Sequence, residues 1–350
     1  MLYNMSQRGA IMKDKIRVIK EHLLVASEVN KIALYNELSR AYMYRDLEAV
    51  ISNANKALTL AIKYEQKNEQ ARSYFNIGAA NFLYQDLKTG VDAYHKANLL
   101  CDPTDNVLKA RIYMGVCLTY TQLHCFEKAL YYGEKALNIA LQEDLYEVQC
   151  SIYNNHGHIY NYLEDYELSD SFFTQGLRIA IHHQYTWKET FLTYNLARNK
   201  LLTGNTDVEE YIFNIESLIE KKDDMWYLGP VQILWALYYI MTDSYENAIP
   251  KIDLGLQILE EEKQDFYHLL AYTDLTHVLT YKNYEIEAEA LYQNYVSYLE
   301  EKNLVLSLPR IYFKMSTFYS KKGQVSLYQK YLRKYVDLKT DLEQYINKFF

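Results

Sequence analysis

The stretch RIYMGVCLTYTQLHCFEKALYYGEKALNIA (residues 111–140) decides the fold, because two other stretches repeat its pattern. They are SIYNNHGHIYNYLEDYELSDSFFTQGLRIA (151–180) and ARSYFNIGAANFLYQDLKTGVDAYHKANLL (71–100). In all three, an aromatic residue is followed four positions later by a tiny one, then by a polar turn and a second run of small and aromatic residues at helical spacing. The aromatic and tiny pairs are Tyr74 and Gly78, Tyr113 and Cys117, and Tyr153 and Gly157.

The pattern continues along nearly the whole chain. Equivalent positions recur 39 to 41 residues apart, at Ser39, Gly78, Cys117, Gly157, Ala197, Ala236, Leu275 and Ser316. Each unit has room for two helices of roughly 15–18 residues joined by short turns. A single hairpin cannot bury its apolar face, so the hairpins must stack on one another and share a continuous core. We therefore predict an all-α solenoid of about eight helical hairpins.

Composition agrees with such a fold. Hydrophobic residues make up 49% of the 350-residue chain, while there are only 11 glycines and 4 prolines, which disfavours a turn-rich β fold. The net charge of −8 disfavours nucleic-acid binding. The strongest apolar run, residues 231–241, is too short to span a bilayer and predicts a buried helix. Four cysteines without a C-x-x-C pair indicate reduced thiols in a cytoplasmic protein.

We expect three segments. Residues 1–30 form an extension with a capping helix over 12–29, residues 31–327 form the repeat array, and residues 328–350 form a helix with a heptad pattern. The heptad seam includes Tyr335, Leu338, Leu342, Tyr345 and Phe349. It predicts either a cover for the last hairpin or a coiled coil that forms a homodimer or leads to an output domain.

Two units depart from the pattern. The fifth has a weak second helix around residues 207–218, and the sixth carries Pro250, expected in the first turn of its second helix. We expect local bends or a break in the superhelix between units five and seven.

Motifs for catalysis do not stand out. The sequence has no Walker loop, no G-x-G-x-x-G, no H-E-x-x-H and no G-x-S-x-G spacing. His156 and His158 are two residues apart, so on a helix they point in different directions. We predict a protein that is not an enzyme and has no metal site, no catalytic residues and no cofactor.

The residue spacing resembles the tetratricopeptide repeat, as do the segments Glu127-Lys128-Ala129-Leu130 and Glu134-Lys135-Ala136-Leu137. The unit of about 40 residues is longer than the usual ~34. It is similar to the arrays of bacterial peptide-sensing regulators of the Rap and PlcR type, and to the sensor halves of repeat-bearing activators, kinases and diguanylate cyclases. The resemblance implies a right-handed α-solenoid whose concave groove binds a peptide or protein segment.

The groove residues follow from that register. The inner stripe of the first helices includes Phe75, Gln122, Asn154, His158, Asn161, Tyr162, Tyr194 and Arg198. Asparagine amides pair with a peptide backbone, and arginine can hold a carboxylate with two hydrogen bonds. The alternative is that these polar residues are solvated or pair between neighbouring helices.

The function expected is therefore regulation by binding a peptide or protein, without catalysis. Two alternatives remain from the sequence: a sensor module whose enzymatic output domain lies outside this chain, and a passive assembly scaffold.

Overall fold

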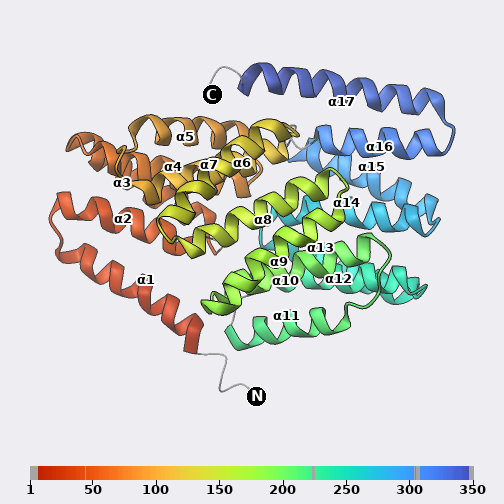
Figure 1. Cartoon of the computed structure of the whole chain (residues 1–350), viewed down its shortest axis with the longest axis horizontal. Helices are drawn as coiled ribbons and strands as arrows, with labels where there is room; N and C mark the ends of the chain where they lie inside the picture. Colours follow the sequence, from red (N-terminus) through yellow and green to blue (C-terminus); the bar gives the residue numbers. More distant parts are fainter. Residues whose placement is uncertain (1–6, 44, 223–224, 303, 305–307, 347–350) are drawn as a thin grey trace.

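The computed structural model describes residues 7–43, 45–222, 225–302, 304 and 308–346, with side chains described for residues 15–43, 45–221, 226–302, 304, 308–341 and 344. Seventeen α-helices and one 3-10 turn are found in this part of the chain, and no strand (Figure 1). They are α1 (Gln7–Val25), α2 (Glu28–Tyr42), α3 (Leu47–Lys63), α4 (Lys67–Leu83), α5 (Leu87–Leu100), α6 (Asn106–Gln122), α7 (Phe126–Gln142), α8 (Tyr146–Tyr162), α9 (Tyr166–His182), α10 (Thr186–Leu202), α11 (Glu209–Lys222), η1 (Met225–Tyr227), α12 (Leu228–Met241), α13 (Tyr245–Glu261), α14 (Asp265–Tyr281), α15 (Glu285–Glu301), α16 (Leu308–Lys321) and α17 (Val325–Ile346).

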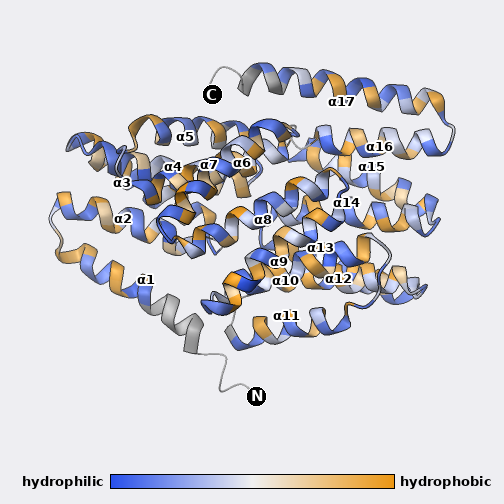
Figure 2. Cartoon of the chain, viewed as in Figure 1, coloured by the Kyte–Doolittle hydropathy of each residue, from blue (hydrophilic) through white to orange (hydrophobic). Residues whose placement is uncertain are grey.

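After α1, the helices pair into eight successive hairpins, from α2–α3 to α16–α17. The all-α hairpin array predicted from the 39–41 residue period is confirmed. The apolar run at 231–241 is the core of α12, in which most side chains are buried. Hydrophobic residues occur on every described helix rather than on one segment, as Figure 2 shows, because each hairpin packs on both of its neighbours.

Most turns between helices share one backbone geometry. A residue with positive φ follows the helix end, and the next N–H donates to a carbonyl five residues back, as in Leu145 N–H to the Ala140 oxygen at 2.9 Å. This pairing closes the free carbonyl end of a helix. It recurs within hairpins and between them, at Glu65, His124, Asp144, Glu164, Gln184, Gly204, Asp243, Lys263, Asn283 and Gly323.

Tiny residues allow the two helices of a hairpin to approach closely. A Cβ atom built on Gly157 would lie 2.3 Å from the Phe173 ring, and one on Gly78 would lie 2.9 Å from the Tyr94 ring. Phe173 and Tyr94 are buried in the space that the missing side chains leave. The aromatic ring of the second helix therefore packs directly on the backbone of the first.

Two sequence-based boundaries were wrong. The first helix ends at Val25 rather than at residue 29, because the Ser27 hydroxyl accepts a hydrogen bond from Asn30 N–H and so starts α2. Pro250 is the sixth residue of α13, beyond the first turn. It is tolerated there because Pro250 and Glu246, whose carbonyl loses its helical partner, both face solvent.

The region between units five and seven is irregular without being broken. Helix α11 has 14 residues, and η1 precedes α12. One core cluster nevertheless extends from Cys150 to Tyr331, through the fifth to eighth hairpins.

The superhelix closes on itself. Phe82 of α4 contacts Phe266 of α14 with ring centroids 5.6 Å apart, and Lys263 pairs with Glu48 of the first hairpin at 2.6 Å. Helix α1 also contacts α11, at the lower edge of Figure 1. The first two hairpins are thus held against the seventh, more than 180 residues later in the chain.

The C-terminal helix α17 packs along α16 and returns toward the third hairpin (Figure 1). Tyr335 lies against Phe313 at 5.2 Å, with His124 at 6.5 Å, and Leu338 packs on the core. The described residues of the predicted heptad seam therefore pack against other helices of the same chain. The side chains of Leu342 and Tyr345, and all of Phe349, lie outside the described residues. No described helix is long and apolar enough to cross a membrane.

Replacing Gly157 with alanine should destabilise the fold, by about 1–3 kcal/mol, because the added methyl group overlaps the Phe173 ring. Urea denaturation of the variant measures this loss. Gln175→Ala, at an exposed position of the same hairpin, is the matched control and should change stability by less than about 0.5 kcal/mol. Equal stability of the two variants would show that the close approach is not needed.

Candidate functional site

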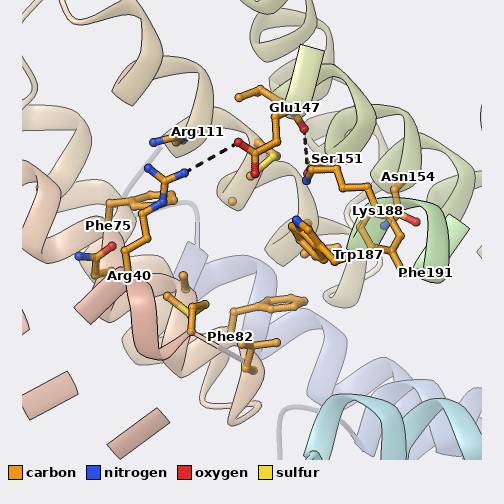
Figure 3. A pocket seen from close by; sticks show the side chains of 18 of the residues that line it. Arg40, Phe75, Phe82, Arg111, Glu147, Ser151, Asn154, Trp187, Lys188 and Phe191 are labelled. Carbon is orange, nitrogen blue, oxygen red and sulfur yellow. Dashed lines mark hydrogen bonds and ion pairs between the residues drawn. The ribbon is translucent and has the colours of Figure 1, made fainter. Parts of the chain in front are cut away.

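A cavity of about 850 Å³ lies inside the closed superhelix. Its lining residues come from α1, α2, α4, α5, α6, α8, α10, η1 and α14. Figure 3 shows part of this lining. This volume is within the ~300–1,000 Å³ typical of ligand pockets. The cavity is therefore bounded by the inner faces of the first helices, where the groove was expected.

Aromatic side chains form much of the wall. They come from five different elements, namely Phe75, Phe82, Tyr94, Trp187, Phe191, Trp226, Tyr227, Phe266 and Tyr267. Rings of this kind give a ligand large apolar contact surfaces at low conformational cost.

Asparagine amides link successive hairpins along the cavity. Asn76 donates to the Asn36 carbonyl oxygen at 3.2 Å, and Asn155 donates to the Met114 carbonyl oxygen at 3.2 Å. Asn195 donates to the Asn154 side-chain oxygen at 2.7 Å. Each bond joins a first helix to the first helix of the preceding hairpin, so these amides set the spacing of the cavity wall.

The sequence-based choice of site residues missed four of these asparagines. Asn36, Asn76, Asn155 and Asn195 occupy nearly equivalent positions of the repeat, two or three residues before the tiny residue. Their recurrence at intervals of about 40 residues is the signal in the sequence by which these asparagines could have been found.

Three of the predicted site residues line the cavity: Phe75, Asn154 and His158. Asn154 is half-buried, and apart from the Asn195 bond its side chain has no partner among the described residues. His158 is buried beside Asn195, with 3.4 Å between its Nε2 and the Asn195 Nδ2. Burial, and then the charges of Arg198 and Arg310, lower the pKa of His158 to about 3, so it is neutral at physiological pH.

The remaining predicted residues, Gln122, Asn161, Tyr162, Tyr194 and Arg198, are not part of the cavity lining. Arg198 differs most from its expected role. It is 1% exposed and donates to both carboxylate oxygens of Asp274, at 2.5 and 2.6 Å, and to the Asn161 side-chain oxygen at 3.0 Å. It therefore has no open side for a ligand carboxylate, because α14 fills that end of the groove.

Tyr162 and Gln122 belong to a second such contact. Tyr162 donates to the Gln122 side-chain oxygen at 2.9 Å and accepts a hydrogen bond from Arg310 of α16 at 2.6 Å. Tyr194 is buried against the rings of Tyr227 and Tyr267. At four of these positions, Gln122, Asn161, Tyr162 and Arg198, the polar side chains of the inner stripe pair between helices, which is the alternative that the sequence left open.

The cavity carries more positive than negative charge, although the whole chain is acidic. Six cationic residues and three acidic ones line it: Lys15, Arg40, Arg45, Arg72, Arg111 and Lys188, against Glu37, Glu69 and Glu147. No cluster of three or more potential metal ligands occurs in the described part of the chain. The arrangement suits an anionic or polar ligand with apolar side chains.

Comparisons with known proteins support the fold. No protein-family model and no curated protein matches the sequence. The Rap protein complexed with Competence and Sporulation Factor is 14% identical, with 96% of this chain and 99% of that chain covered and a TM-score of 0.61. The Rap conjugation gene regulator of plasmid pLS20, in complex with the Phr* peptide, is 14% identical, with 95% and 96% covered and a TM-score of 0.61.

Aspartyl phosphate phosphatase F from Bacillus subtilis is 15% identical, with 96% of this chain and 91% of that chain covered and a TM-score of 0.53. These likenesses confirm the resemblance to Rap-type repeat arrays that the sequence indicated. At such low identity the shared property is the fold, and the cavity residues have to be interpreted from this chain.

Replacing Asp274 with alanine should lower the free energy of unfolding by about 3–5 kcal/mol, because Arg198 would keep its charge in a buried site without a partner. The double variant Arg198→Met/Asp274→Leu should recover most of that loss. Urea denaturation of both variants tests this. A double variant no more stable than Asp274→Ala would contradict the interpretation that the unpaired charge causes the loss.

Stability should decrease as the pH falls below about 6.5, the ordinary pKa of histidine. In the folded state His158 stays neutral down to about pH 3, whereas in the unfolded chain it takes up a proton, so acid favours unfolding. His158→Gln should therefore lose less stability between pH 7 and pH 4 than the native protein does. The exposed His182→Gln is the control, and unfolding at a series of pH values is the measurement. Identical losses of stability in all three proteins would refute the conclusion that His158 stays neutral in the folded state.

Proposed function

We propose that this protein is a non-catalytic regulator that binds a short peptide in its central cavity. The observation that carries the proposal is the cavity itself, which combines aromatic walls with amide groups at hydrogen-bonding positions. Its chemistry matches an extended peptide, whose backbone offers both N–H and C=O groups and whose side chains need apolar contacts.

The amide of Asn154 is the best placed group for a peptide backbone. Its oxygen is held by Asn195, which fixes the orientation of the side chain, and its N–H donors have no partner among the residues described. A backbone carbonyl of the peptide would accept from it. A preorganised donor of this kind adds affinity because little rotational freedom is lost on binding.

The solved structures of similar fold support the proposal from another direction. Two of them are complexes with a peptide factor, the Competence and Sporulation Factor and the Phr* peptide. A comparable function here would be exerted by contact with another protein rather than by catalysis. No disulfide joins any of the four cysteines in the described part of the chain, which supports a cytoplasmic location.

Ligand binding would stabilise the closed superhelix. The cavity touches the first two hairpins on one side and α14 on the other, so a peptide that fills it would bridge the segments that close the ring. A ligand that binds the closed form better than an open one shifts the population toward closure. Helices α1 and α2 are part of the wall and would be fixed by the same event.

Affinity selection from a randomised pool of six-residue peptides, read by mass spectrometry, tests peptide binding. The native protein should retain peptides, and Asn154→Ala should retain roughly tenfold less, since one buried hydrogen-bond donor is removed. Asn161 should not be replaced at the same time, because its side chain supports Arg198.

The matched control is Asn55→Ala, at an exposed position of α3 outside the cavity. It should retain as much peptide as the native protein does. Thermal unfolding of all three proteins separates lost binding from lost structure. If the native protein retained no peptide, or if Asn154→Ala and Asn55→Ala behaved alike, the proposed site would be wrong.

A further inference from the structure

Lys188 is a buried cation without an anionic partner. Its side chain is 2% exposed, and its ammonium group donates to the Ser151 hydroxyl at 2.5 Å. It lies 4.2 Å from the Trp187 ring centroid and 5.6 Å from that of Phe191. Burial lowers its pKa to about 8, and no carboxylate in the described part of the chain lies within ion-pair distance.

Arg111 is a second cation without an ion-pair partner on the same wall, at a half-buried position. It has no hydrogen bond or ion pair with any described residue, although its neighbours Arg40 and Arg72 do. Burial, and then the charge of Arg40, lower the pKa of Arg111 to about 10. Its guanidinium group therefore has donors that the protein itself does not satisfy.

One carboxylate lies among these cations. Figure 3 shows Glu147 between Arg40 on one side and Ser151 and Lys188 on the other. Glu147 reaches Arg40 at 4.0 Å, the outer limit of an ion pair. It offsets one of the three positive charges. Asp105, the other carboxylate that acts on Arg111, is already paired with Arg72.

An arrangement with uncompensated buried charge is unfavourable for the empty protein. A buried cation without a partner destabilises a fold, and an apolar residue of the same size is often tolerated better. Such clusters are typical of sites that bind a ligand of opposite charge. The whole chain has a net charge of −8, so the excess of positive charge is a local property of this corner of the cavity.

We propose that the corner formed by Arg40, Arg111 and Lys188 binds a carboxylate of the peptide, so that the cavity selects acidic peptides. The inference rests on the proposed function and specifies the class of peptide. Arg111 can hold both oxygens of a carboxylate, and Lys188 supplies a point charge. Phe75, Trp187 and Phe191 provide an apolar surface beside it for a neighbouring side chain.

The carboxylate could belong to an aspartate or glutamate side chain or to the peptide C-terminus. The same randomised six-residue pool, prepared once with free and once with amidated C-termini, distinguishes the two sources. If the carboxylate belongs to a side chain, the peptides retained from both pools are enriched in Asp and Glu, by roughly tenfold for one charge-assisted hydrogen bond. With a C-terminal source, amidation lowers retention by a similar factor.

The double variant Arg111→Gln/Lys188→Met should lose that preference while still retaining neutral peptides. Lys56→Gln is the matched control, because Lys56 is an exposed cation of α3 outside the cavity, and it should keep the preference. Retention without any preference for carboxylates, or a preference unchanged in the double variant, would overturn this inference and leave peptide binding intact. No retention by the native protein would overturn both.

Thermal unfolding without peptide gives an independent readout. Lys188→Met should unfold at the same or a higher temperature than the native protein, because it removes a buried charge that lacks a partner. A lower unfolding temperature would show that Lys188 serves the fold instead of a ligand. The single variant Arg111→Gln, at a half-buried position, supplies the binding test if the double variant does not fold.

Discussion

The ion pair between Arg198 and Asp274 is the contact on which the shape of the molecule depends. Both side chains are almost completely buried, and they join α10 to α14 across 76 residues of sequence. An open solenoid has contacts only between neighbouring repeats. Here a charged contact between non-adjacent units places α14 inside the superhelix, and the contacts of α14 with α4 and of Lys263 with the first hairpin follow from that position.

The closed ring divides the inner stripe of the first helices into two parts. Toward the start of these helices the stripe stays open and forms the cavity, with Asn154 as an example. Toward their ends the same stripe meets α14 and α16, and Asn161 becomes part of a polar core. Two residues of one helix face, seven positions apart, thus have different roles because the packing partner changes along the helix.

The fold could be predicted from the sequence because it depends on local periodicity. The recurrence of tiny residues such as Gly78 and Gly157 gave the hairpins, their number and their approximate bounds. The turns with positive φ were not predictable, since most carry Gln, Glu, Asp or His at the position where glycine would be the usual signal.

The site was only partly predictable, because its composition depends on contacts between distant units. The register placed Phe75, Asn154 and His158 on the inner face, where the structure has them. The repeat register could not show that Arg198 is already paired with Asp274, because this ion pair arises only when the superhelix closes. Arg111 and Lys188 were overlooked for a related reason: their significance lies in the absence of a partner, which only the three-dimensional arrangement reveals.

Ring closure also restricts how such a protein can change in length. Solenoids without closure can gain or lose a whole unit, because each unit meets only its neighbours. In this chain an extra hairpin of about 40 residues between α10 and α14 would rotate and shift Asp274 away from Arg198 and leave both charges buried alone. The ion pair between Arg198 and Asp274 therefore fixes the number of hairpins between these two residues. Variation in repeat number is expected only outside the closed segment.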